Sequence, residues 1–382
     1  LIVMNHADRQ DPLVVMALAK HLGGAVYCLV AREAFDWNQG IRGWLFQRFG
    51  CFSVSRGIVD FKSVKTIEKV LTDSASRLIV FPEAEVTGDD ATVHNVSRSL
   101  MHIVLSAQKE LIKAKAPRSL CILPVGVSYR LVTDLERSTN ATLNRIARQL
   151  NLKHEPGSDV TTRVRTAIGI ILQTLAQHYE IVLPEQASHH EQVHLLARHI
   201  CRRIALSAGV NLEAEQSTEQ HLYFLRSATV EGATAHFRRK RRNRVARIDD
   251  DTPSRYQQKL RRPLPNIISQ MLRDLDRVEL LLILQRVLNQ PSSPIQTCRV
   301  LDCLELEVTG RMRAKGKQRA SIYLGELIDV MPHWQAYTAN KNSAIDKLCD
   351  TVRAGLQSAL DRAHEAEKLP LINALRYNLS KQ

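Results

Sequence analysis

The residues best suited to chemistry in this sequence are His6 and Asp11, which stand five positions apart near the start of the chain. Histidine is mostly neutral at pH 7, so it can remove the proton of an alcohol. A carboxylate against the second ring nitrogen would fix the tautomer and stabilise the imidazolium as it forms. The apolar residues 1–4 predict a strand, and Asp11-Pro12 predicts an N-cap and the first residue of a helix. We therefore predict that His6 is a general base on the strand-to-helix loop and that Asp11 orients it.

Three further blocks follow in the first third of the chain. Residues 50–56 end on Arg56, whose planar guanidinium can bind a phosphate through two parallel hydrogen bonds. Residues 81–83, Phe-Pro-Glu, place an acid behind a proline turn, and residues 123–125, Leu-Pro-Val, lie in an apolar run. A base, an orienting acid and a phosphate-binding arginine are the groups needed to acylate an alcohol that carries a phosphate. Taken singly, each block also fits an ordinary structural role. Asp11 could cap a helix, Arg56 could be solvated, and Glu83 could be a strand-end carboxylate. Residues 123–125 could form a strand bend.

The order and spacing of these blocks resemble the glycerophospholipid acyltransferase family, which includes the 1-acylglycerol-3-phosphate O-acyltransferases. His6 and Asp11 match the family's His-x4-Asp motif and are the expected catalytic residues. The resemblance implies that Arg56 holds the phosphate of the acceptor and that residues 123–125 lie on the acyl-chain side of the site. The substrate-binding residues expected from the four motifs are Asn5, Arg56, Phe81, Pro82, Glu83 and Pro124.

The resemblance implies an O-acyltransferase of phospholipid biosynthesis. Such an enzyme moves a fatty acyl group from acyl-coenzyme A or acyl carrier protein to the hydroxyl of a glycerol-phosphate-type acceptor, here expected to be lysophosphatidic acid. The acceptor hydroxyl can attack the thioester directly once a base removes its proton, so no serine or cysteine nucleophile is required. The acyl donor is a co-substrate, and neither a cofactor nor a metal ion is expected.

The third motif departs from the family pattern. The usual continuation after Glu83 is Gly-Thr-Arg, whereas this chain has Ala84, Glu85 and Val86. Alanine in place of glycine matters if the position requires a positive φ. Val86 removes one expected phosphate contact, which bears on the identity of the acceptor. Glu83 itself could bind the glycerol hydroxyls or support His6.

Residues 1–135 alternate β-rich runs with amphipathic stretches, which predicts an α/β fold with a mixed sheet flanked by helices. Strands are expected at residues 1–4, 25–30, 51–54, 78–81 and 120–129. Helices are expected at residues 11–21, 38–49, 63–74 and 97–113.

After residue 135 the composition predicts a large, basic, helical insertion over residues 136–295. Its expected helices span residues 158–179, 188–208, 217–246 and 266–289. Strand character returns at residues 319–330 and a helix is expected at 344–363, and in the resembled family such elements complete the catalytic sheet. We therefore predict a discontinuous α/β domain made of residues 1–135 and 296–366, followed by a tail over 367–382.

The 382 residues carry a net charge of +14, which favours anionic partners such as nucleic acid, a membrane surface or phosphorylated substrates. The 7 cysteines form no disulfide pattern, so a reducing, cytoplasmic compartment is expected. No run approaches the roughly 18 apolar residues of a membrane span. The chain opens inside an apolar run, and we expect that residues are missing upstream of Leu1. These features predict a cytoplasmic protein that binds anionic membranes peripherally.

Two motifs compete with this interpretation. His190-Glu191-Gln192-Val193-His194 fits the H-E-x-x-H signature of zinc peptidases, although its basic surroundings indicate a solvated helix. A distant Glu213 or Glu215 would have to supply the third ligand.

The densest basic run spans residues 238–244. It is expected to face anionic lipid headgroups or solvent, and no nucleic-acid partner is expected because no aromatic-rich binding motif accompanies it.

Two alternative functions therefore stay open beside the acyltransferase. One is a zinc hydrolase centred on His190. The other is a non-catalytic adaptor that binds membranes or nucleic acid on a decayed acyltransferase fold. The G-x-S-x-G elbow of serine hydrolases is absent from the sequence.

Overall fold

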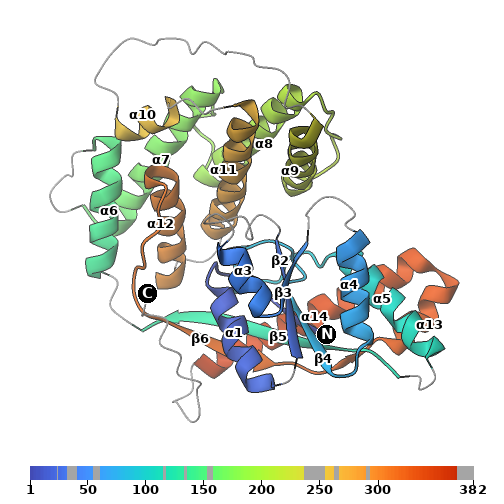
Figure 1. The fold of residues 1–382 in the computed structure, drawn as a ribbon. Helices are drawn as coiled ribbons and strands as arrows, with labels where there is room; N and C mark the ends of the chain where they lie inside the picture. The colour runs from blue at the N-terminus through green and yellow to red at the C-terminus, as the bar shows by residue number, and fades with distance from the viewer. Residues whose placement is uncertain are drawn as a thin grey trace. The chain divides into compact units, whose positions relative to one another are not determined.

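The computed structural model divides the chain into two compact units (Figure 1). The first combines Leu1–Val132 with Gln318–Gln382, and the second is Thr133–Lys317. The residues described are 1–23, 25–31, 41–54, 61–114, 118–132, 136–152, 158–235, 254–261, 266–289 and 293–367.

The first unit is built on a seven-stranded mixed sheet. The strands are β1 (Ile2–Met4), β2 (Ala25–Ala31), β3 (Cys51–Val54), β4 (Ser76–Val80), β5 (Cys121–Leu131), β6 (Gln318–Leu324) and β7 (Ile328–Asp329). Their order is β3-β2-β4-β1-β5-β6, with β7 also paired to β5. Strands β1 to β5 are parallel, and β6 and β7 run antiparallel to β5. The predicted mixed α/β fold is confirmed.

Helices connect and cover these strands. They are α1 (Asp11–Leu22), α3 (Ile41–Arg48), α4 (Phe61–Thr72), α5 (Arg98–Lys113), α13 (Met331–Ala339) and α14 (Lys341–Glu367). Every strand and helix predicted between Leu1 and Val132 is present, and the predicted ends lie close to the observed ones. The exception is residue 38, the predicted start of the second helix, which lies outside the described residues. An apolar cluster lies under α4, α5 and α14, and Val3, Val104 and Leu348 there are completely buried. Alternating apolar runs were therefore enough to locate these elements.

The C-terminal segment completes this sheet by direct packing on β5. Strand β6 pairs with β5 from Leu324 opposite Val125 to Gln318 opposite Leu131. Helix α14 crosses β5 so closely that a Cβ added at Gly126 would lie 2.3 Å from the backbone of Ala359. Only glycine allows this approach.

The strand predicted at residues 319–330 is split into β6 and β7. Pro124 lies at the break in the ladder, where it has no N–H to donate, and its carbonyl accepts a hydrogen bond from Gly325 N at 2.8 Å. Residues 123–124 of β5 lie opposite residues 325–327, so the segment between β6 and β7 has one extra residue, as in a β-bulge.

The second unit is helical. It contains α6 (Glu136–Leu150), α7 (Val160–Tyr179), α8 (His189–Ala208), α9 (Thr218–Ala235), α10 (Arg255–Arg261), α11 (Ile267–Leu288) and α12 (Pro294–Thr309). The four helices predicted for the insertion correspond to α7, α8, α9 and α11. The predicted extension to residue 246 lies outside the described residues. The prediction missed α6, α10 and α12.

The predicted return to the α/β domain at residue 296 was wrong. Residue 296 lies in the first turn of α12, where Ser293 and Gln296 form a capping box. Leu301 and Leu304 of this helix are buried in the core of the helical unit. The α/β unit resumes only at Gln318, so the boundary falls about one helix later than the composition indicated.

Buried ion pairs cross the helical core. Arg277 donates from Nε to Oε1 of Glu307 at 3.0 Å, and Tyr256 donates to the same oxygen at 2.8 Å. Tyr179 donates to Asp274 at 2.7 Å. Removing one partner of this network would leave a buried charge uncompensated, which would destabilise the helical unit. Among the residues described in either unit, no helix is long and apolar enough to cross a bilayer.

Candidate active site

His6 and Asp11 are in direct contact. The Nδ1 atom of His6 lies 2.7 Å from Oδ2 of Asp11, and their side chains are 13% and 1% exposed. His6 follows β1 at the carboxyl edge of the parallel strands, and Asp11 is the first residue of α1. In open α/β sheets this edge is where ligands bind. The predicted proximity of the two residues is therefore present.

The sequence predicted that Asp11 is the N-cap of α1, but the structure places it one position later, as the first residue of the helix. The N-cap is Gln10, and its side chain makes no capping bond. The carboxylate of Asp11 instead turns back, so that Oδ2 accepts a second hydrogen bond from Asp8 N at 3.0 Å. Oδ1 accepts a hydrogen bond from the hydroxyl of Tyr129. Asp11 lies at the N-terminus of α1, where the helix dipole stabilises a negative charge.

The imidazole of His6 is held flat against the ring of Phe81. The ring centroids are 4.0 Å apart and the planes differ by 17°. With Nδ1 turned to Asp11, the ring directs Nε2 away from the carboxylate. Among the described residues, none is seen to hydrogen-bond to Nε2. This nitrogen is the atom that could take a proton from a substrate.

Glu83 fixes the backbone around His6. One carboxylate oxygen accepts a hydrogen bond from His6 N at 2.9 Å, and the other accepts one from His94 N at 2.8 Å. Burial raises the pKa of Glu83, and the two N–H donors partly oppose that rise. Of the two roles considered for Glu83, the hydrogen bonds favour support of His6 over binding of glycerol hydroxyls.

The altered third motif forms a tight turn. Ala84 N donates to Phe81 O at 3.0 Å, and Pro82 O accepts a hydrogen bond from Ser97 N at 2.9 Å. Ala84 has φ of 62°, a region that glycine occupies freely and alanine does not. The position therefore requires the positive φ that the usual glycine would supply. Alanine takes the same conformation under strain.

Asn5 and Pro124 have structural contacts where substrate contacts were expected. Asn5 is 1% exposed, and its amide both donates to Val127 O at 2.9 Å and accepts from Val127 N at 2.7 Å. It thereby continues the pairing of β1 with β5. Pro124 is buried in β5 beside Gly325 and Gly355. Both residues position the site from within the sheet.

Sequence reasoning missed several groups around the dyad. Tyr129 lies on β5, 118 positions from Asp11, and no motif marks it. Thr87 donates from both its backbone N–H and its hydroxyl to His6 O, at 2.7 and 3.1 Å. The alternation of side chains along β5 predicts the face of the sheet that Tyr129 occupies, but it does not predict that the hydroxyl contacts Asp11.

A second histidine–aspartate pair adjoins the first. The Nε2 atom of His94 lies 3.1 Å from Oδ2 of Asp89. Burial would raise the pKa of Asp89, but the hydrogen bond to His94 and two backbone N–H donors outweigh it and lower the pKa. The segment from Glu83 to His94 thus wraps the His6 loop with buried, satisfied polar groups.

Arg56 and the basic run at residues 238–244 lie outside the described residues. Strand β3 ends at Val54, two positions before Arg56, at the same carboxyl edge as His6. Three strand spacings separate β3 from β1, which is roughly 14 Å at about 4.8 Å per strand.

The H-E-x-x-H segment opens α8 in the helical unit. Glu191 accepts hydrogen bonds from the backbone N–H and the hydroxyl of Ser188, because the two residues form a capping box. His190 Nε2 and His194 Nδ1 each lie 3.4 Å from Nε2 of Gln285. No group of three histidine, cysteine or acidic side chains suited to a metal ion occurs among the residues described. Glu191 therefore serves the helix start, which the sequence motif could not reveal.

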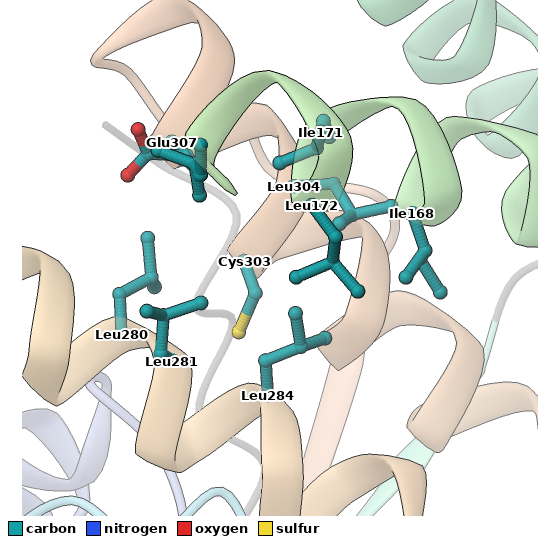
Figure 2. Close-up of a pocket in the computed structure, with 10 residues that line it drawn as sticks. Ile168, Ile171, Leu172, Leu280, Leu281, Leu284, Cys303, Leu304 and Glu307 are labelled. Carbon is teal, nitrogen blue, oxygen red and sulfur yellow. The ribbon is translucent and has the colours of Figure 1, made fainter. Parts of the chain in front are cut away.

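Figure 2 shows an enclosed cavity in the helical unit. Aliphatic side chains from α7, α11 and α12 converge on it, with Cys303 and Glu307 at its wall. Its volume of about 10 Å³ is no larger than one water molecule requires. The cavity as it stands has no room for an acyl chain.

The comparisons with known proteins concern the first unit. Residues 1–128 match the family model described as Acyltransferase, a span that contains all four sequence blocks. The predicted resemblance is confirmed over this span, and the match supports acyltransferase activity for it. No curated protein and no solved structure gives a significant match to the chain.

Proposed function

We propose that this chain, which carries an Acyltransferase domain over residues 1–128, transfers a fatty acyl group from acyl-coenzyme A or acyl carrier protein to the hydroxyl of a glycerol-phosphate-type acceptor. The observation that carries the proposal is the 2.7 Å contact between His6 and Asp11. It leaves Nε2 of a half-buried imidazole available at the carboxyl edge of the sheet.

In the proposed reaction His6 acts as the base. Its Nε2 takes the proton of the acceptor hydroxyl while the hydroxyl oxygen attacks the thioester carbonyl carbon. Asp11 holds Nδ1–H and stabilises the imidazolium that forms. When the tetrahedral intermediate collapses, the carbon–sulfur bond breaks and the leaving thiolate takes the proton back from Nε2. The base is then neutral again.

Arg56 is the proposed phosphate ligand. A guanidinium forms two parallel hydrogen bonds to a phosphate, which suits an acceptor such as lysophosphatidic acid. Val86 stands where the family pattern has an arginine, so this chain would rely on fewer cations to hold the phosphate. We therefore expect the acceptor to be weakly bound in the absence of Arg56.

Peripheral attachment to an anionic bilayer is proposed for the same protein. Residues 133–317 contain 29 Lys and Arg against 20 Asp and Glu, and the run at 238–244 is their densest part. Cations near an anionic surface contribute on the order of 1 kcal/mol each. Attachment of this kind would place the acyltransferase domain beside lipid substrates.

The direct test is an acyl-transfer assay. Purified protein is incubated with labelled acyl-coenzyme A or acyl carrier protein and a panel of lysophospholipids and glycerol 3-phosphate. We expect one acceptor class to be acylated by the wild type and not by His6→Ala. Transfer that survives His6→Ala unchanged, or its absence with every acceptor, would contradict the proposal and favour a non-catalytic adaptor.

The acceptor site is tested by Arg56→Ala. The KM for the acceptor should rise while the KM for the acyl donor stays nearly constant, because the guanidinium is assigned to the phosphate. Lys65→Ala, at an exposed position of α4, is the charge-matched control. Equal changes in both KM values would show that Arg56 has another role.

The membrane proposal is tested by sedimentation with vesicles. Binding should require anionic lipid and be lost at high salt, since the Debye length falls from about 10 Å at 0.1 M to about 3 Å at 1 M. Neutralising the basic run should weaken binding without changing turnover of a soluble acceptor. The substitutions are glutamine at Arg238, Arg239, Lys240, Arg241 and Arg242. Salt-insensitive binding to neutral vesicles would contradict an electrostatic attachment.

A further inference from the structure

Two cysteines face each other on adjacent parallel strands. Cys28 of β2 is in register with Cys51 of β3, so their side chains leave the sheet on the same face. Neighbouring strands are about 4.8 Å apart, which falls within the Cα separations of about 4.4–6.8 Å that a disulfide spans. Gly50, just before Cys51, keeps the strands close, because a Cβ there would lie 2.4 Å from Val26 O.

Each thiol also shifts the pKa of the other, and Cys28 Sγ lies 3.6 Å from the carbonyl oxygen of Leu29. The neighbouring Cys28 thiol lowers the pKa of Cys51 despite the opposing effect of burial. The same pair interaction, together with burial, raises the pKa of Cys28. Cys51 is half-buried, whereas Cys28 is 7% exposed. Cys51 is thus the more acidic and the more accessible thiol of the pair, and Cys28 is buried on the neighbouring strand.

We propose that Cys28 and Cys51 form a reactive dithiol, in which Cys51 attacks small disulfides and Cys28 resolves the product. This is a thiol-modification site in the acyltransferase domain, separate from the His6–Asp11 dyad. It does not depend on the proposed acyl-transfer function.

The chemistry is a pair of thiol–disulfide exchanges. The Cys51 thiolate attacks one sulfur of oxidised glutathione, the disulfide bond breaks, and one glutathione leaves as a thiolate. Cys28 then loses its proton and attacks the Cys51 sulfur of the mixed disulfide, which releases the second glutathione. Two protein thiols are oxidised to one disulfide, and one glutathione disulfide is reduced to two thiols.

The other cysteines provide internal references. Cys349 is half-buried like Cys51, but burial raises its pKa. Burial raises the pKa of Cys201 to about 12. Cys121 is exposed, and its neighbours across the sheet are Leu1, just before β1, and Asp329 of β7. Under the proposal Cys51 should react first although Cys121 is the more exposed.

The first experiment uses wild-type protein and mass spectrometry of its peptides. The reduced protein is treated with oxidised glutathione, quenched with acid at intervals, and digested. We expect a Cys28–Cys51 disulfide as the product, and attack at Cys51 several-fold to about tenfold faster than at Cys349. Labelling of Cys51 no faster than Cys349 would overturn the proposal. So would a lasting glutathione adduct on Cys51 beside a reduced Cys28, or a disulfide between two chains.

Two substitutions separate the two roles of Cys28. Cys28→Ser keeps a hydrogen-bond donor but no sulfur, so the reaction should stop with one glutathione on Cys51, formed at nearly the wild-type rate. Cys28→Ala removes the donor as well and should slow that attack. Equal rates for the two variants would overturn the proposed activation of Cys51 by the side chain at position 28. Circular dichroism checks that each variant is folded, and the wild-type peptide map decides the proposal if a variant is not.

Discussion

The hydroxyl of Tyr129 donates a hydrogen bond to Oδ1 of Asp11, the carboxylate oxygen that does not face His6. Oδ2 is shared by His6 Nδ1 and Asp8 N. The carboxylate is therefore held on both oxygens, and its plane sets the direction of the imidazole. Tyr129 is 2% exposed and its hydroxyl meets the dyad at Asp11, so we assign it a positioning role.

Replacing Tyr129 with phenylalanine should loosen this arrangement. The loss of a hydrogen bond to a buried charged group is expected to lower the free energy of unfolding by about 1.5–3 kcal/mol. The kcat should fall while the KM of the acceptor stays constant, since the hydroxyl orients the dyad and does not contact substrate. Urea unfolding and steady-state kinetics measure the two effects, with Tyr323→Phe at a partly exposed position of β6 as the control. An unchanged kcat would show that Tyr129 contributes to stability alone.

The dyad itself should carry the acyl transfer. His6→Ala is expected to reduce turnover by at least about 10²–10⁴-fold, the usual range for loss of a general base. Asp11→Asn should be similarly severe because the imidazole loses its orienting charge. His21→Ala, at an exposed histidine of α1, should turn over like the wild type. Activity of His6→Ala near the wild-type level would rule out the mechanism.

Glycine at position 84 should stabilise the protein. Alanine at φ of 62° is strained, and relief of that strain should exceed the entropy that glycine adds to the unfolded chain. We expect Ala84→Gly to raise the free energy of unfolding by roughly 0.5–1 kcal/mol. Ala114→Gly is the matched control, because Ala114 has φ of −65° and should lose stability on the same change. A loss of stability in both variants would argue against strain at Ala84.

The close crossing of α14 over β5 makes Gly126 irreplaceable. A Cβ at this position would meet the carbonyl carbon of Ala359 at 2.3 Å, and backbone cannot move aside as a flexible side chain can. Gly126→Ala should therefore lower the free energy of unfolding by about 3 kcal/mol or more. At Gly169 of α7 the nearest atom is 3.7 Å away, so Gly169→Ala should be neutral or stabilising. Thermal unfolding distinguishes the two, and a mild effect at Gly126 would show that α14 is not packed on β5 in solution.

The helical unit should lose stability in mild acid because of His178. Burial, together with the charges of Arg277, Arg273 and Arg203, lowers the pKa of His178 to about 4. The unfolded chain therefore binds a proton between pH 6.5 and about 4 that the folded chain does not. Because protonation of His178 favours the unfolded chain, the free energy of unfolding is unaffected by this residue above pH 6.5 and decreases as the pH falls toward 4.

The test for His178 compares urea midpoints at pH 7 and pH 5. His178→Gln should show a smaller fall than the wild type, because glutamine does not titrate. His21→Gln should fall as the wild type does. Identical falls for all three proteins would mean that His178 is protonated in the folded state.

Local patterns in the sequence were sufficient for the strands and helices between Leu1 and Val132 and for the contact between His6 and Asp11. That contact depends on one short loop, so spacing alone predicts it. Tyr129 and the support from Glu83 depend on which strands are neighbours, which spacing along the chain does not specify. The helix α12 was mistaken for the start of the returning sheet domain because its burial depends on helices far away in the sequence. Ala84 was identified as a position of interest, but its φ is set by the turn and needed the structure.

The split of the sheet domain around residues 133–317 has a consequence for synthesis. When translation has reached Val132, β5 still lacks β6, and the cover provided by α14 lies beyond the whole helical unit in the sequence. An unpaired strand edge of this kind invites pairing with other chains. All helices of the inserted unit lie within residues 133–317, so every partner in its core has been synthesised before β6 begins. A nascent chain of this protein would thus complete its nested unit before its enclosing one, and its dependence on chaperones should be greatest before Gln318 appears.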